Sequence, residues 1–147
     1  MPYHTYLDLI VEPIKDEIDN YNWIVSDVEY HSTITDLPID MHKDYSILSP
    51  SEFRILLNSH VQLWWCVVLA VSTSAEIKLD ENNLPYAEGN DLIWENGSLQ
   101  HQNAEIEIDC FDSGYTIIKF TDKNLSEKFK DFFGGDAIPL DDFNKRK

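Results

Sequence analysis

Residues 61–71 constrain the fold most strongly, because this run of eleven residues contains a single strongly polar side chain, Gln62. Its β-branched and aromatic residues favour an extended strand. Apolar side chains fall on both faces of such a strand, so we predict a central strand that is covered on both sides, or on one side and at an interface. Trp64 and Trp65 would then face opposite sides of the sheet. The run is shorter than the roughly 20 residues that span a bilayer.

The residues before this strand predict two helices and a second strand. Apolar residues recur at helical spacing over residues 6–18, and Pro13 should kink or restart that helix. Residues 22–30 favour a strand, whereas residues 32–44 lack any period and predict a loop. The sequence Ser49-Pro50-Ser51-Glu52 is a helix-start signal with Ser49 as the N-cap.

After the central strand, turn-prone residues separate a series of short strands. We predict these strands at 91–95, 97–100, 104–111 and 115–121, with a further short one near 76–79, followed by a helix over 123–133 that buries Leu125, Phe129, Phe132 and Phe133. Strict alternation over residues 105–110 places Ile106, Ile108 and Cys110 inward and Glu105, Glu107 and Asp109 on the solvent face.

These elements together predict an α+β fold, with one domain over residues 1–140 and a flexible C-terminal tail over residues 141–147. The sheet should be mostly antiparallel or mixed, with helices packed on it. The two cysteines, Cys66 and Cys110, lie in apolar stretches, which predicts buried free thiols. The start of the sequence lacks a secretory signal pattern, so we expect a cytoplasmic protein.

The charge of the chain is strongly negative and unevenly distributed. The 147 residues carry 27 acids and 11 bases, for a net charge of −16. Residues 1–114 hold 21 of the acids and only 4 of the bases, whereas residues 115–147 are nearly balanced, with 6 acids and 7 bases. Nucleic acids and anionic membranes are therefore unfavourable partners, because both would be repelled.

Catalytic and metal-binding patterns are weak. We find no nucleophile elbow, no glycine-rich phosphate loop and no zinc spacing. We therefore expect that the protein is not an enzyme and that it binds neither a cofactor nor a metal. One alternative stays open, in which His31, His42 and nearby carboxylates form the pocket of a small ligand- or metal-binding domain. Another is homodimerisation through the apolar central strand.

A second set of residues combines aromatic rings with carboxylates, as a surface that binds a basic protein would. Aromatic side chains supply desolvated area, and acids attract the cationic partner. We take Tyr86 and Trp94 as the candidate anchors. The full predicted set of partner-binding residues is Glu76, Asp80, Glu81, Tyr86, Glu88, Asp91, Trp94, Glu95, Glu105, Glu107, Asp109 and Asp112.

The order of elements resembles a family of small bacterial proteins. An aromatic strand at Tyr21-Asn22-Trp23-Ile24, a capped helix, a very apolar strand and the Asp112-Ser113-Gly114-Tyr115 hairpin before a closing helix are similar to immunity proteins of polymorphic toxin and contact-dependent growth inhibition systems. The resemblance implies an acidic, cytoplasmic antitoxin that binds and blocks a cognate basic toxin domain, often a nuclease. We expect it to be a monomer or a weak homodimer.

Overall fold

The computed structural model describes residues 5–145, which form a five-stranded antiparallel sheet with the order β2-β1-β3-β4-β5. The strands are β1 (Tyr21–Tyr30), β2 (Tyr45–Leu48), β3 (Leu63–Ser72), β4 (Ala104–Phe111) and β5 (Tyr115–Phe120). The predicted α+β class is confirmed, and the most apolar strand, β3, lies at the centre of the sheet. The short strand β2 was not predicted, because its four residues carry too little pattern to stand out from the preceding loop.

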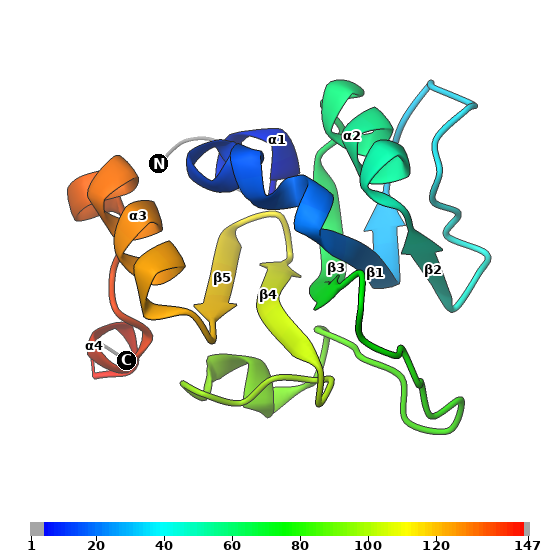
Figure 1. Ribbon diagram of the computed structural model, residues 1–147. Coiled ribbons are helices and arrows are strands. Elements are labelled where there is room, and N and C mark those ends of the chain that lie inside the picture. The colour runs from blue at the N-terminus through cyan, green and yellow to red at the C-terminus, as the bar shows by residue number, and fades with distance from the viewer. Residues whose placement is uncertain (1–4, 146–147) are drawn as a thin grey trace.

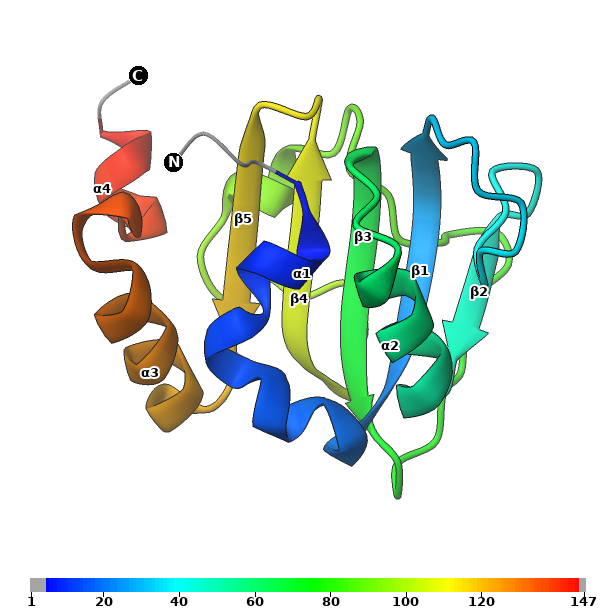
Figure 2. The same cartoon turned by 90° about the horizontal axis from the view of Figure 1, so that it is seen from above.

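Three helices cover one face of the sheet (Figures 1 and 2). They are α1 (Leu7–Ile10), the 3₁₀ helix η1 (Glu12–Asn20) and α2 (Pro50–Asn58). Pro13 lies in the first turn of η1, where its missing N–H costs little, so the predicted break is confirmed. Beneath α2, the ring of Trp23 stacks on Phe53 with a centroid distance of 4.0 Å, and both side chains are buried.

The start of α2 is fixed by the predicted cap. The Ser49 hydroxyl accepts a hydrogen bond from the Glu52 N–H at 3.2 Å, and the Glu52 carboxylate accepts one from the Ser49 N–H at 3.0 Å. This reciprocal capping box satisfies two backbone donors that the helix would otherwise leave unpaired.

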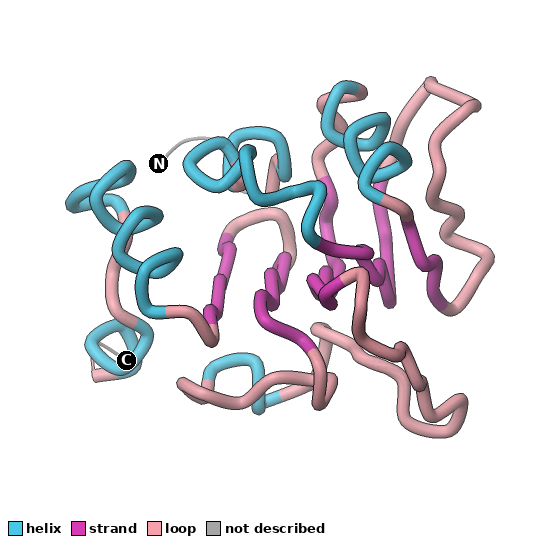
Figure 3. The backbone as a smooth tube through the Cα atoms, in the orientation of Figure 1, coloured by secondary structure: helices cyan, strands magenta, loops and turns pink. Residues whose placement is uncertain are grey.

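The opposite face of the sheet is covered by an irregular chain, residues 73–103, which we call the covering segment (Figure 3). Its one helical element among the described residues is the 3₁₀ helix η2 (Asp91–Trp94). The strands predicted at 76–79, 91–95 and 97–100 are therefore wrong. Ala87 and Ile93 of the segment are fully buried in a second core, together with these sheet residues: Ile24, Val67, Leu69, Val71 and Ile117.

The C-terminal part of the chain adds α3 (Lys123–Phe133), the 3₁₀ turn η3 (Gly134–Asp136) and α4 (Leu140–Asn144). Leu125 is buried as predicted, but Phe132 is 58% exposed, because α3 lies beyond the β5 edge rather than over the sheet. Within the predicted tail, residues 141–144 lie in α4, and Phe143 stacks on Trp94 at 5.7 Å. Residues 146–147 of that tail lie outside the described residues.

The two cysteines lie opposite each other on β3 and β4, and both are free and fully buried. Burial raises the pKa of the Cys66 and Cys110 thiols, so both remain protonated and unreactive near neutral pH. No helix within residues 5–145 is long and apolar enough to cross a membrane.

Candidate partner-binding surface

The covering segment presents carboxylates outward along its length. Six of its acids are exposed, and the one lysine among them, Lys78, is exposed as well. These acids, all members of the predicted set, are Glu76, Asp80, Glu81, Glu88, Asp91 and Glu95. Figure 1 shows the segment on the side of the sheet opposite α1 and α2, so the six exposed carboxylates all belong to the chain that covers this side of the molecule. We call this side the acidic surface.

Two hydrogen bonds extend the acidic surface to neighbouring elements. At one margin, the Tyr45 hydroxyl of β2 donates to Glu81 Oε1 at 2.9 Å, and this bond raises the Tyr45 pKa. At the other margin, Asn96 Nδ2 donates to Asp141 Oδ2 of α4 at 3.3 Å. The contribution of Asp141 was missed, because the C-terminal residues carry no sequence signal that attaches them to the segment.

Among the apolar side chains of this surface, Tyr86 and Leu92 are the exposed ones, at 42% and 52%. Tyr86 is a predicted anchor and is available to a partner. Trp94, the other predicted anchor, is only half-exposed, because its ring packs against Phe111 at 5.1 Å and stacks on Phe143. Trp94 therefore attaches the segment to β4 and α4, and Leu92 offers the more accessible contact.

Two predicted surface residues, Glu107 and Asp109, are fully buried, so their placement on the solvent face is wrong. The alternation along β4 is as expected: Ile106, Ile108 and Cys110 pack toward the helices. The opposite face is not open to solvent, however, because the covering segment lies on it. Neither carboxylate can contact a partner in this structure.

Glu107 instead belongs to a buried ionic cluster beneath the covering segment. Glu107 pairs directly with Lys119 across β4 and β5, and Lys119 Nζ lies 3.6 Å from Glu107 Oε2. Glu107 Oε1 accepts the Gln100 N–H at 2.7 Å, while Lys119 Nζ donates to the carbonyl oxygens of Leu92 at 3.1 Å and Ser98 at 2.7 Å. These bonds compensate for much of the cost of burying two charges.

Asp109 lies two residues further along β4, opposite Val67 and Ile117. Neither of its carboxyl oxygens has a hydrogen-bond donor among the described residues. Burial, and then the adjacent Glu107, raise the pKa of Asp109 to about 10, and Lys119 only partly opposes them. Asp109 is therefore neutral at physiological pH.

The remaining two predicted residues, Asp112 and Glu105, lie outside the covering segment in the chain. Asp112 is exposed in the turn between Phe111 and Tyr115, which both contact Trp94, so it adjoins the acidic surface. Glu105 is half-buried. Burial raises the Tyr21 pKa, and the charge of Glu105 raises it further. A register shift of β3 against the start of β4 displaces Glu105 from the simple alternation.

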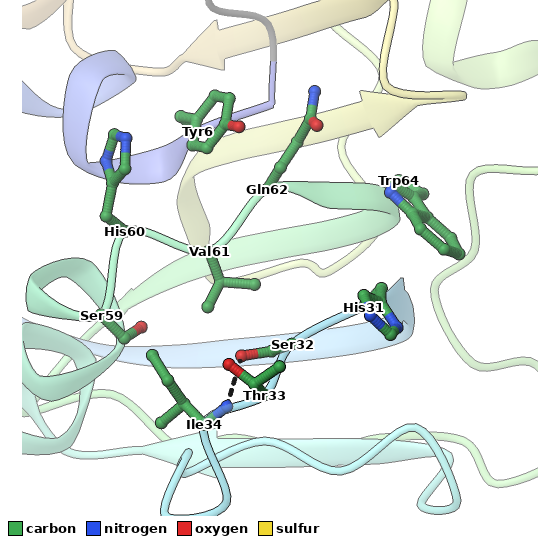
Figure 4. A pocket seen from close by; sticks show the side chains of 10 residues that line it. All are labelled: Tyr6, His31, Ser32, Thr33, Ile34, Ser59, His60, Val61, Gln62 and Trp64. Atoms are coloured by element: carbon green, nitrogen blue, oxygen red, sulfur yellow. Dashed lines mark hydrogen bonds between the residues drawn. The ribbon is translucent and has the colours of Figure 1, made fainter.

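The alternative pocket is only partly assembled. His31 lines an open groove of about 450 Å³ (Figure 4), formed by Tyr6, His31, Ser32, Thr33, Ile34, Ser59, His60, Val61, Gln62 and Trp64. His31 stacks near Trp64 at one end, whereas His60 stacks on Tyr6 at the other and its Nδ1 lies 2.6 Å from Asp8 Oδ2. The two imidazoles therefore do not converge on one point.

His42 does not line this groove. It is exposed, and its N–H donates to Asp40 Oδ1 at 2.8 Å within a turn. Across residues 5–145, no group of three His, Cys, Asp or Glu side chains is arranged to hold a metal ion. The structure thus separates His31 from His42, the two histidines on which the alternative depends.

Comparisons of the chain with protein-family models, curated proteins and solved structures found no match. The fold and the surface define a small α+β domain in which an irregular acidic segment covers one face of an antiparallel sheet.

Proposed function

We propose that the protein is an immunity protein that binds a basic bacterial toxin domain and blocks it by covering its active-site groove. It acts in the cytoplasm by stoichiometric binding rather than by catalysis. The toxin we propose is a nuclease, since a groove that holds nucleic acid is positively charged and would accept a negative surface in place of its substrate.

The observation that supports this proposal most directly is the excess of exposed carboxylates on the covering segment, which exposes six acids and one lysine, Lys78. The covering segment directs six carboxylates to solvent, whereas Lys119, the nearest cation of the sheet beneath it, is 5% exposed and bonded to the segment's carbonyl groups. The buried Lys119 is also paired with Glu107, so it does not offset the charge of the exposed carboxylates. Such a field accelerates the capture of a cationic partner by orders of magnitude at low salt.

The acidic surface also contains exposed apolar area, which a bound partner would bury away from water. Tyr86 is flanked by Glu88, and Leu92 lies between Asp91 and Glu95 in the chain. Interfaces of this type combine apolar contacts that limit dissociation with surrounding charges that increase the association rate. We therefore expect a partner with basic residues around a small apolar contact.

Growth rescue tests the proposal. The toxin domain encoded next to this gene would be expressed in a sensitive host, with the wild-type protein or one of two variants that each remove three negative charges. The surface triple variant is Glu88→Gln/Asp91→Asn/Glu95→Gln. The control triple variant, at exposed positions of η1 and α3, is Asp16→Asn/Glu127→Gln/Asp131→Asn.

Wild type and control triple variant should restore growth, and the surface triple variant should fail although it accumulates to the same level. Equal rescue by both variants would show that the acidic surface does not mediate inhibition. Failure of the wild type to rescue growth or to bind the toxin domain would refute the proposed function itself.

A further inference from the structure

The covering segment is ordered without belonging to the sheet. It spans residues 73–103, and its apolar contribution to the second core includes the fully buried Ala87 and Ile93. A chain of this length with so little regular secondary structure must satisfy its backbone polar groups by other means. The hydrogen bonds of the structure show how this is done.

Side chains of the sheet bind the main chain of the segment. On β1, the Ser26 hydroxyl donates to the Pro85 carbonyl at 2.6 Å, and Asp27 Oδ2 accepts the Ala87 N–H at 3.2 Å. On β4 and β5, Glu107 and Lys119 bind Gln100 N, Leu92 O and Ser98 O. Five main-chain groups of the segment are thus held by four side chains from three strands.

Three of these four side chains are buried: Ser26, Glu107 and Lys119 have 0%, 0% and 5% exposure. Hydrogen bonds in such surroundings are costly to break, because a buried group would be left unpaired. Their partners are backbone atoms: every residue supplies a carbonyl oxygen, and every residue other than proline also supplies an N–H. The anchoring therefore places little restriction on which side chains the segment carries outward.

Inward side chains of the segment complete the framework. The Asn90 side chain caps η2 by accepting the Leu92 N–H at 3.1 Å, and it donates to the Tyr86 carbonyl at 3.0 Å. His101 bridges two parts of the segment: its Nδ1 accepts the Asn103 N–H and its Nε2 donates to the Lys78 carbonyl, both at 3.0 Å. These are again bonds to the main chain.

The outward side chains near η2 have no such role. Within residues 5–145, the side chains of Glu88, Asp91 and Glu95 form no hydrogen bond or ion pair, and Leu92 is 52% exposed. The segment thus separates residues that hold its conformation from residues that face solvent.

We infer that the covering segment is the specificity-determining part of the interaction surface. Its main chain is fixed by Ser26, Asp27, Glu107 and Lys119. Its outward side chains can be exchanged without loss of the fold. The inference rests on the proposed function for the nature of the partner, a cationic protein. It adds that different outward side chains on the same framework would select different partners. Recognition residues elsewhere are also often carried on irregular segments that a rigid scaffold positions.

Two display libraries of the full-length chain test this inference. One randomises outward positions Glu88, Asp91, Leu92 and Glu95, and the matched one randomises inward positions Ala87, Asn90, Ile93 and His101. Protease resistance on the cell surface reports folding and needs no partner. Most clones of the outward library should remain resistant to protease, with unfolding midpoints within about 2 °C of the wild type. Few clones of the inward library should remain resistant. Similar losses of resistance in both libraries would overturn the inference.

Hydrogen exchange of the Ser26→Ala variant tests the anchoring directly. Removing the hydroxyl leaves the Pro85 carbonyl without its donor, so amides of the covering segment should exchange about tenfold faster while those of β3 stay protected. Unchanged exchange throughout the segment would contradict main-chain anchoring.

Outward clones that stay folded should then differ from the wild type in binding the toxin domain. If folded outward clones all bind as the wild type does, the segment does not determine specificity, and this inference fails while the proposed function stands. If the wild type itself does not bind, the proposed function fails, and the folding and exchange results still decide whether the segment is anchored as inferred.

Discussion

Asp109→Asn should stabilise the protein increasingly as the pH rises. The carboxyl of Asp109 is fully buried, and its pKa is raised from 3.8 to about 10 by burial and by Glu107. The folded state therefore keeps a proton that the unfolded chain releases above pH 4. For a group with a raised folded pKa, the stabilisation is full below the unfolded pKa and is lost as the pH rises toward the folded value.

The size of the effect follows from the width of that interval. One pKa unit corresponds to 1.36 kcal/mol, so between pH 5 and pH 8 the wild type should lose about 4 kcal/mol through this group. Asparagine stays uncharged over the whole range, and its amide can donate to the buried Glu107 Oε2, which lacks a hydrogen-bond donor. Any constant cost of fitting the amide cancels when the two pH values are compared.

Urea unfolding followed by tryptophan fluorescence at pH 5, 6, 7 and 8 measures the difference in unfolding free energy between variant and wild type. That difference should shift by about 4 kcal/mol in favour of Asp109→Asn across the range. Asp112→Asn is the matched control, because Asp112 is exposed at the end of the same strand, and it should show no such trend. A difference for Asp109→Asn that does not depend on pH would refute this account of the buried cluster.

Further substitutions test other parts of the fold by equilibrium unfolding and thiol labelling. Lys119→Met should lower the free energy of unfolding by about 3–5 kcal/mol, because it leaves Glu107 buried without its cation. Adding Glu107→Leu should recover much of this loss. No recovery in the double variant would argue against the ion pair. Ser49→Ala should cost about 1 kcal/mol through loss of the capping box, whereas an unchanged urea midpoint would show that the cap is dispensable. Cys66 and Cys110 should resist a thiol reagent at pH 8 until the protein unfolds, and rapid labelling of the native protein would contradict their burial.

Local patterns in the sequence predicted the framework of the fold. The apolar run at residues 61–71 led to the central strand β3, and the Ser49 cap led to α2, because both signals depend on neighbouring residues alone. The alternation of β4 correctly placed Ile108 inward. The same alternation was misleading for Glu107. A period of two residues indicates which face of the sheet a side chain is on, but it does not indicate whether that face is covered.

The covering segment is the reason that the candidate surface was predicted only in part. Residues 91–100 have short apolar and turn-rich stretches typical of hairpins, but the segment is held by side chains distant in sequence, such as Ser26 and Lys119. No local signal reports such bonds. Apolar residues spaced along the segment, such as Ile77, Ile93 and Leu99, were the local indication that it packs on the sheet.

Titration calorimetry of the purified protein with the purified toxin domain at two salt concentrations tests the central claim most directly. Binding should weaken as salt increases, and the affinity should fall about a hundredfold for the surface triple variant but stay unchanged for the control triple variant. Salt-independent binding with equal affinity for both variants would show that the acidic surface of the covering segment is not the binding site.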